Sequence, residues 1–214
     1  MAYATVGDLI KAFREDEHDN VAPFMWSDAQ LERFANEALI EFAERTKSIY
    51  DDESEAALLD YRAGEQDLDL HPAVIDVVEA YVGDRTLRIA APGTVRRSAL
   101  PSGGRPELLV LNRSSGLMRM HPAPAAAGTL ELLVVRKPLA EVGKADSIPD
   151  VPLDERRHLM LFIKHRAYGV ADADIFDATR AAQFLAEFER ACQGIYENAL
   201  RRRASASQGI RFRW

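Results

Sequence analysis

The spacing of apolar residues changes twice along this 214-residue chain, and this change limits the folds that the chain can adopt. Apolar residues recur at helical spacing in residues 1–63. Residues 64–138 contain short apolar runs separated by Gly, Pro, Asn and Ser, which is typical of strands. Helical spacing returns in residues 139–203. This order predicts an α+β fold, mainly α, in which both chain ends form a helical bundle that carries a small β-rich insertion.

Two amphipathic helices are predicted in the N-terminal part. Thr5 is the expected N-cap of the first helix, whose apolar positions are Val6, Leu9, Ile10 and Phe13. Pro23 lies in the segment that separates the helices. Ser27 is the expected N-cap of a second helix of about six turns. The apolar stripe of this helix consists of Leu31, Phe34, Ala35, Ala38, Leu39, Phe42 and Ile49. A short helical piece is expected at residues 53–63.

The middle of the chain favours strands. The strand-like runs are DLDL, VIDVVEAYV, TLRIA, PELLVLN, GLMRMHP and GTLELLVVRKP. The second of these could also begin with one helical turn after Pro72. The sequence LLVLNRSSGLMRM predicts a hairpin with NRSSG as its loop. The insertion is too short and uneven for a complete barrel to be expected.

A helical hairpin is predicted near the C-terminus. Its first helix is expected to start at Pro152 or shortly after and to bury Leu159, Phe162, Ile163, Ala167 and Val170. The sequence ADAD breaks the pattern, and Asp174 is the expected N-cap of the second helix. The apolar positions of that helix are Phe176, Ala181, Phe184, Leu185, Phe188, Ala191, Cys192, Ile195 and Leu200. Cys192 is the only cysteine, so no intramolecular disulfide can form, and we expect it to be buried.

Charge is distributed unevenly between the body of the protein and its last residues. The net charge is −7, and residues 1–60 hold fifteen Asp and Glu against five Lys and Arg. The last fourteen residues, RRRASASQGIRFRW, contain five arginines and no acidic residue. A general nucleic-acid binder would be expected to have a basic stripe on its folded body, which this distribution does not favour.

Residues 204–214 are predicted to form a flexible arm that binds another protein. Residues 204–209 would be its spacer, and the three apolar residues after the spacer alternate with two arginines, which suits an extended strand. Strand addition or groove docking is therefore a plausible binding mode. The alternatives are an end without function and weak attachment to DNA phosphates. The predicted partner-binding residues are Arg201, Arg202, Arg203, Ile210, Arg211, Phe212, Arg213 and Trp214.

The sequence offers no catalytic or cofactor-binding motif. It lacks GxGxxG, GxxxxGK[ST], GxSxG and HExxH, so we expect neither an enzyme nor a cofactor. His158 and His165 share a helix face, but no Cys or carboxylate at ligand spacing joins them, so a zinc site is not expected. The glycines of SGGRP fit a surface turn better than a phosphate loop. ADADIFD resembles part of a calcium loop but lacks its Gly and Glu. No signal peptide or apolar run of about 18 residues is present, so we expect an intracellular product without a membrane partner.

Several stretches resemble tailed-bacteriophage head-to-tail adaptor (connector) proteins. TVGDLIKAFREDEHD and MWSDAQLERFANEALIEFAERTKSI are similar to the start of these proteins, and LDLHPAVIDVVEAYVGDRTL, LMRMHPAPAAAGTLELLVVRKPL and IPDVPLDERRHLMLFIKHRAYGVADADIFDATRAAQFLAEFERA are similar to later parts. The resemblance covers about residues 4–200. The matching residues near the start are Trp26, Ser27, Asp28, Leu31, Asn36, Glu37, Ala38, Arg45 and Thr46.

The resemblance implies a structural role in the virion, in the neck between capsid and tail. Such adaptors form a ring, commonly of twelve copies, that extends the DNA channel below the portal and offers a docking surface to a tail, nozzle or head-completion protein. The genomic DNA would pass through without sequence-specific binding, and an acidic body would avoid gripping it. In this family a C-terminal arm often embeds in the portal. The resemblance implies the same role for the arm of this chain, on its position and composition only. The alternative is a nucleic-acid-associated regulatory protein that uses its Arg-rich tail.

Overall fold

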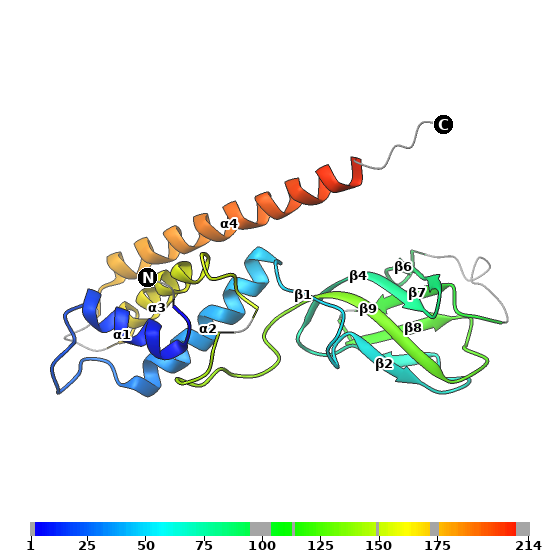
Figure 1. The fold of residues 1–214 in the computed structure, drawn as a ribbon, viewed down its shortest axis with the longest axis horizontal. Helices are drawn as coiled ribbons and strands as arrows, with labels where there is room; N and C mark the ends of the chain where they lie inside the picture. The colour runs from blue at the N-terminus through cyan, green and yellow to red at the C-terminus, as the bar shows by residue number, and fades with distance from the viewer. Residues whose placement is uncertain (1–2, 95–103, 113, 149, 172–175, 209–214) are drawn as a thin grey trace. The chain divides into compact units, whose positions relative to one another are not determined.

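The chain forms two compact units. The structure, a computed structural model, describes residues 3–94, 104–112, 114–148, 150–171 and 176–208 (Figure 1). The helical unit combines both chain ends, Met1–Ile49 and Pro138–Trp214, and the β unit is Tyr50–Lys137. The predicted α+β class is therefore confirmed, with terminal helices that pack together and a β region in the middle of the sequence.

Four α-helices are present among the described residues of the helical unit. They are α1 (Val6–Asp16), α2 (Asp28–Thr46), α3 (Leu159–Tyr168) and α4 (Ala178–Gln208), and a short 3-10 turn, η2 (Arg156–His158), precedes α3. Capping boxes start the first two helices. Thr5 exchanges hydrogen bonds with Asp8, and Ser27 does so with Gln30, so each side chain satisfies a backbone N–H that has no partner within its helix. Both predicted N-caps are confirmed.

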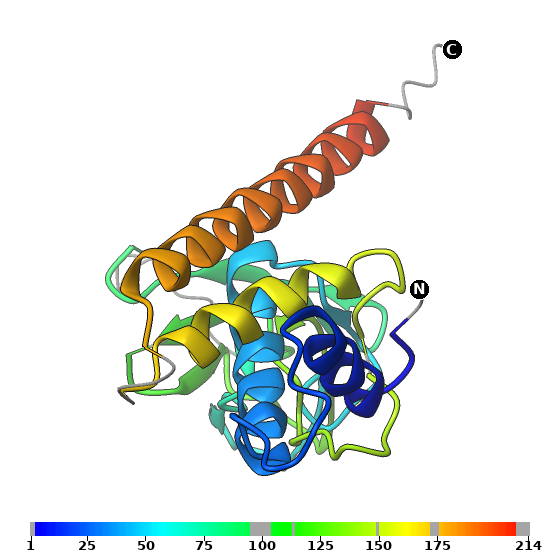
Figure 2. The same cartoon turned by 90° about the vertical axis from the view of Figure 1, so that its left-hand side faces the viewer.

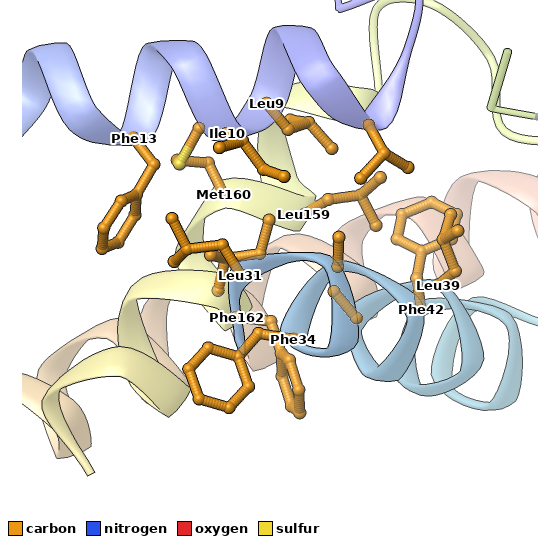
Figure 3. Packing of buried hydrophobic residues seen from close by; sticks show 14 of the residues in the cluster. Leu9, Ile10, Phe13, Leu31, Phe34, Leu39, Phe42, Leu159, Met160 and Phe162 are labelled. Atoms are coloured by element: carbon orange, nitrogen blue, oxygen red, sulfur yellow. The ribbon is translucent and has the colours of Figure 1, made fainter. Parts of the chain in front are cut away.

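Apolar side chains from all four helices form one core. Figure 3 shows Phe13 of α1, Leu31 and Phe34 of α2 and Phe162 of α3 directed into this cluster. Phe188 contributes from α4, with 5.2 Å between its ring centroid and that of Phe162. The other fully or almost fully buried members include Val6, Leu9, Ala35, Ala38, Leu39, Phe42, Leu159, Ile163, Ala167 and Cys192. The predicted apolar stripes thus pack against one another.

The β unit consists of two sheets. Its strands are β1 (Tyr50–Asp51), β2 (Leu58–Tyr61), β3 (Asp67–Asp69), β4 (Val74–Val82), β5 (Arg85–Thr86), β6 (Arg88–Ala90), β7 (Leu108–Asn112), β8 (Leu117–His121) and β9 (Gly128–Arg136). One sheet has the order β1-β9-β4-β5, with β2 also paired to β9, and the other has the order β3-β8-β7-β6. All pairs are antiparallel except β6 with β7.

Both sheets contribute to one buried cluster. Leu130, Leu132 and Val134 come from the first sheet, and Met118 and Met120 come from the second. The alternation of buried and exposed residues along β8 follows from the period of two in a strand. The predicted β7–β8 hairpin is confirmed, with Asn112 opposite Leu117. The run TLRIA is divided between β5 and β6.

Some local predictions for the first half of the chain are wrong. Residues 53–63, predicted as a helical piece, form a turn and then β2. The Asp51 carboxylate accepts hydrogen bonds from the N–H groups of Glu53 and Ser54, which fixes the turn and lets β2 pair with β9. Ile49 is buried but follows α2, because Lys47 ends this helix in the left-handed conformation.

The C-terminal helices also start later than predicted. The segment from Pro152 forms turns before α3 begins at Leu159, and Val170 follows the end of α3. The N-cap of α4 is Asp177, whose carboxylate accepts a hydrogen bond from the N–H of Arg180, whereas Asp174 lies outside the described residues. Phe176 therefore precedes α4 and is 56% exposed. The predicted antiparallel hairpin is confirmed, since His165 near the end of α3 bonds Ala181 near the start of α4.

Candidate partner-binding surface

Helix α4 is much longer than the helices against which it packs. Its 31 residues span about 47 Å, against about 15 Å for the ten residues of α3. Ala181, Phe188 and Cys192 are buried in the first two thirds of α4, and Ile195 packs partly against the core. Farther along, Leu200 is 44% exposed. Figure 2 shows α4 continuing past the ends of α1, α2 and α3.

The predicted partner-binding residues divide between this helix and the end of the chain. Arg201, Arg202 and Arg203 lie on α4. The Arg201 guanidinium is 3.6 Å from the carboxylate of Glu197 on the same helix, and its side chain is 76% exposed. The remaining predicted residues, Ile210, Arg211, Phe212, Arg213 and Trp214, lie outside the described part of the chain.

Residues 204–208, predicted to be a flexible spacer, continue α4 instead. The physical reason is visible in the sequence, because no proline or glycine follows Leu200 until Gly209 and alanine is a strong helix former. The three arginines at 201–203 lie on the helix, as predicted, and the helix continues beyond them.

A groove lies between α2 and the segment that follows β9. Its volume is about 690 Å³, and its lining includes Ala29, Glu32 and Ile40 of α2 and Leu139 and Glu141 of residues 138–141. We call this cavity the α2 groove. Ile40 and Leu139 are 40% and 38% exposed, so the groove offers apolar surface to a partner.

Two polar attachments hold the segment against α2. The Asn36 amide nitrogen donates to the carbonyl of Val142 at 3.0 Å, and the N–H of Val142 donates back to the amide oxygen at 2.7 Å. Asp28 also binds Lys144 at 2.5 Å and Arg14 at 2.6 Å. Hydrogen bonds from Lys144 and then Arg14 lower the pKa of the Asp28 carboxyl. These contacts fix the second wall of the α2 groove on the folded core.

The lining of the α2 groove contains three carboxylates, Glu32, Glu37 and Glu141, and one basic residue, Arg33. Glu37 binds Arg166 at 2.7 Å and lies 3.8 Å from Arg33. Within the described residues, neither Glu32 nor Glu141 forms an ion pair. These carboxylates would therefore attract a positively charged partner. Such attraction raises the specificity and the rate of association more than the affinity.

A second cavity, of about 530 Å³, lies where the ends of α1, α3 and α4 meet. Its charges are paired with one another. Lys164 binds Asp16 at 2.7 Å and Glu17 at 3.0 Å, and the Tyr168 hydroxyl donates to Glu17. Burial, together with the neighbouring Glu17 carboxylate, raises the pKa of Tyr168 to about 12. This network joins the three helices and offers few unpaired charges to a ligand.

Neither a metal-binding cluster nor a membrane-spanning helix is found among the described residues. They contain no group of three His, Cys, Asp or Glu side chains arranged to hold a metal ion. His165 binds the carbonyl of Ala181, and Nε2 of His158 accepts a long hydrogen bond from Arg157. None of the helices described is long and apolar enough to cross a bilayer.

The α2 groove could not be predicted from local sequence patterns, because it joins segments about a hundred residues apart. One signal was present. Ile40 is a large apolar residue that does not belong to the buried stripe of α2, and Leu139 follows Pro138 in a polar connector. Isolated exposed apolar residues are common, so this signal gains meaning only when the two side chains are found in one cavity.

Comparison with known proteins agrees with the adaptor resemblance. The family model described as SU10 adaptor protein matches residues 4–211, nearly the whole chain. No curated protein matches the chain significantly. The matched family consists of phage head-to-tail adaptors, which are structural rather than catalytic proteins. The chain belongs to the SU10 adaptor protein family.

Proposed function

We propose that this protein forms a ring, of twelve copies, between the portal and the tail of a phage particle. The family match over residues 4–211 is the observation that carries this proposal. In this role the ring extends the channel through which genomic DNA passes. The net charge of −7 supports it, because acidic walls repel the phosphates of the duplex.

The C-terminal arm is the element that we propose docks on the portal. Helix α4 carries the chain beyond the core of the helical unit, so residues 209–214 follow the outer end of a long helix. Three apolar residues and two arginines in these six positions provide side chains of the types enriched at binding hot spots. On the other side, the ring offers a docking surface to a tail, nozzle or head-completion protein.

A deletion of residues 209–214 tests this role, because it leaves all of α4 in place. Purified full-length and truncated chains are mixed with the portal, and bound rings are counted by negative-stain microscopy. We expect loss of portal binding and an unchanged melting temperature for the truncated chain. The matched control is the double substitution Arg211→Lys and Arg213→Lys, which keeps the charge and the apolar residues. Full-strength portal binding by the truncated chain would contradict the docking arm.

A further inference from the structure

We propose that the outer part of α4 from one copy docks in the α2 groove of a neighbouring copy. The outer part of α4 comprises residues 197–208. This inference rests on the proposed ring, for which it names the two surfaces that join adjacent subunits. It adds a second role to the C-terminal region, because the portal would be engaged by residues 209–214 and the neighbouring subunit by the helix that precedes them.

No described side chain in the outer part of α4 belongs to the buried core of its own chain. After Ile195 no described residue of α4 belongs to the core, and the ion pair of Arg201 is made with Glu197 on the same helix. A helix that exposes Leu200 next to three arginines is therefore suited to bind in a groove lined by both apolar and acidic side chains.

The α2 groove has the complementary chemistry. Its apolar walls include Ile40 and Leu139, which can receive Leu200. Glu32 and Glu141 line the groove without an ion-pair partner among the described residues, and they can meet Arg201, whose side chain is 76% exposed. Opposite charges around an apolar contact give an interface both orientation and register.

The geometry of the helical unit prevents a copy from filling its own groove. Arg45, at the C-terminal end of α2, binds Glu189 in the middle of α4 at 2.9 Å. The outer part of α4 continues from Glu189 beyond the core, whereas the groove lies along residues 29–40 of α2, which precede Arg45. An outer part of α4 that fills this groove must therefore belong to a second molecule. Two different surfaces meet in such a contact, which is the heterologous arrangement that closes into rings.

A cysteine pair tests the contact in the full-length chain. Leu200→Cys and Leu139→Cys variants are mixed at high concentration, alone and with portal, and treated with a short bismaleimide. We expect a mixed dimer, and no dimer from either variant alone. The wild-type chain is the background control, because its only cysteine, Cys192, is buried. Leu200→Cys mixed with Leu58→Cys, an exposed leucine of the β unit, is the matched control and should give no dimer.

Charge reversal tests whether the carboxylates select this occupant. Adding Arg201→Glu to the Leu200→Cys chain should lower the mixed-dimer yield about tenfold, because like charges then face each other. When Glu32→Arg is then added to the Leu139→Cys chain, the yield of mixed dimer should return, because opposite charges face each other again. The matched change Glu55→Arg, on an exposed residue of the β unit, should not restore the yield.

Two results would overturn the inference. One is the absence of a mixed dimer both alone and with portal, and the other is a yield that charge reversal leaves unchanged. Retention on the portal, measured in the same mixtures, reports on the proposed function separately. A chain that binds portal but gives no mixed dimer would therefore refute the subunit contact and leave the adaptor role intact.

Discussion

The indole N–H of Trp26 donates a hydrogen bond to the backbone carbonyl of Ala167, with 3.0 Å between the two atoms. Trp26 precedes α2, and Ala167 lies in the last turn of α3, so this bond joins the two halves of the helical unit. The Trp26 ring also packs edge-on against Phe13 at 5.1 Å and Tyr168 at 5.9 Å between ring centroids. One buried side chain thus connects α1, α2 and α3.

Replacing this side chain tests its contribution to stability. We expect Trp26→Phe to lower the free energy of unfolding by about 2 kcal/mol, because a buried hydrogen bond is lost and a smaller ring leaves a cavity. Urea unfolding followed by circular dichroism measures the change. Met25→Leu, a substitution at the adjacent exposed residue, is the matched control and should change stability by less than about 0.5 kcal/mol. Equal losses for both variants would contradict the prediction.

The buried Asp51 carboxylate, which accepts hydrogen bonds from Ser54 and Arg136, should make the β unit sensitive to acid. Burial alone raises the pKa of Asp51, but hydrogen bonds from Ser54, Arg136 and the N–H of Glu53 outweigh it and hold the pKa well below its usual range. A carboxyl with a depressed folded-state pKa stabilises the fold above its unfolded pKa of about 3.9. This stabilisation should be lost as the pH falls below about 4 towards the folded-state pKa.

Asp51→Ala should therefore destabilise the β unit at neutral pH, by about 3 kcal/mol, because the buried guanidinium loses this carboxylate. The variant should also lose less stability than the wild type when the pH is lowered, because it no longer carries this carboxylate. Hydrogen exchange of the β-strand amides at pH 7 and pH 3 measures both effects. The neighbouring Asp52 is exposed, so Asp52→Ala is the matched control. An unchanged acid profile in Asp51→Ala would show that other groups cause it.

The thiol of Cys192 should be inert in the folded protein. Burial raises its pKa to about 12, so almost no thiolate is present at pH 8, and the side chain is only 1% exposed. We expect slow reaction with Ellman's reagent in buffer and rapid reaction in 6 M guanidinium chloride. Rapid modification under native conditions would mean that α4 leaves the core often.

Binding to duplex DNA should be weak and should come from the C-terminal arginines. If all five contact phosphates, the slope of log K against log salt reaches about −4.5. Deleting residues 209–214, which removes two arginines, should make the slope about 2 units shallower. A gel-shift series over salt concentration measures this change. Tight, steeply salt-dependent duplex binding that is lost with the deletion would instead favour the nucleic-acid-associated alternative.

Local signals in the sequence were sufficient to predict α1 and α2. Their caps, Thr5 and Ser27, act within three residues, and their stripes repeat with the helical period. Residues 53–63 were mispredicted because β2 forms by pairing with β9, about seventy residues away, which local periodicity does not report. The α2 groove escaped prediction for the same reason, since the pair of Asn36 and Val142 is separated by 106 residues. The predicted helix also ended too early, at residue 203, although no proline or glycine occurs before Gly209 to stop it.

The pairing of β1 with β9 has a consequence for how this family can diversify. The chain enters the β unit at Tyr50 and leaves it after Arg136, and Tyr50 lies opposite Val135 in the sheet. Entry and exit are therefore neighbouring strands, only about 5 Å apart. Because the two ends of the β unit are so close together, the unit can be replaced, enlarged or removed at a small cost in loop-closure entropy. Evolution can thus remodel this insertion while the surrounding helices keep their sequence constraints.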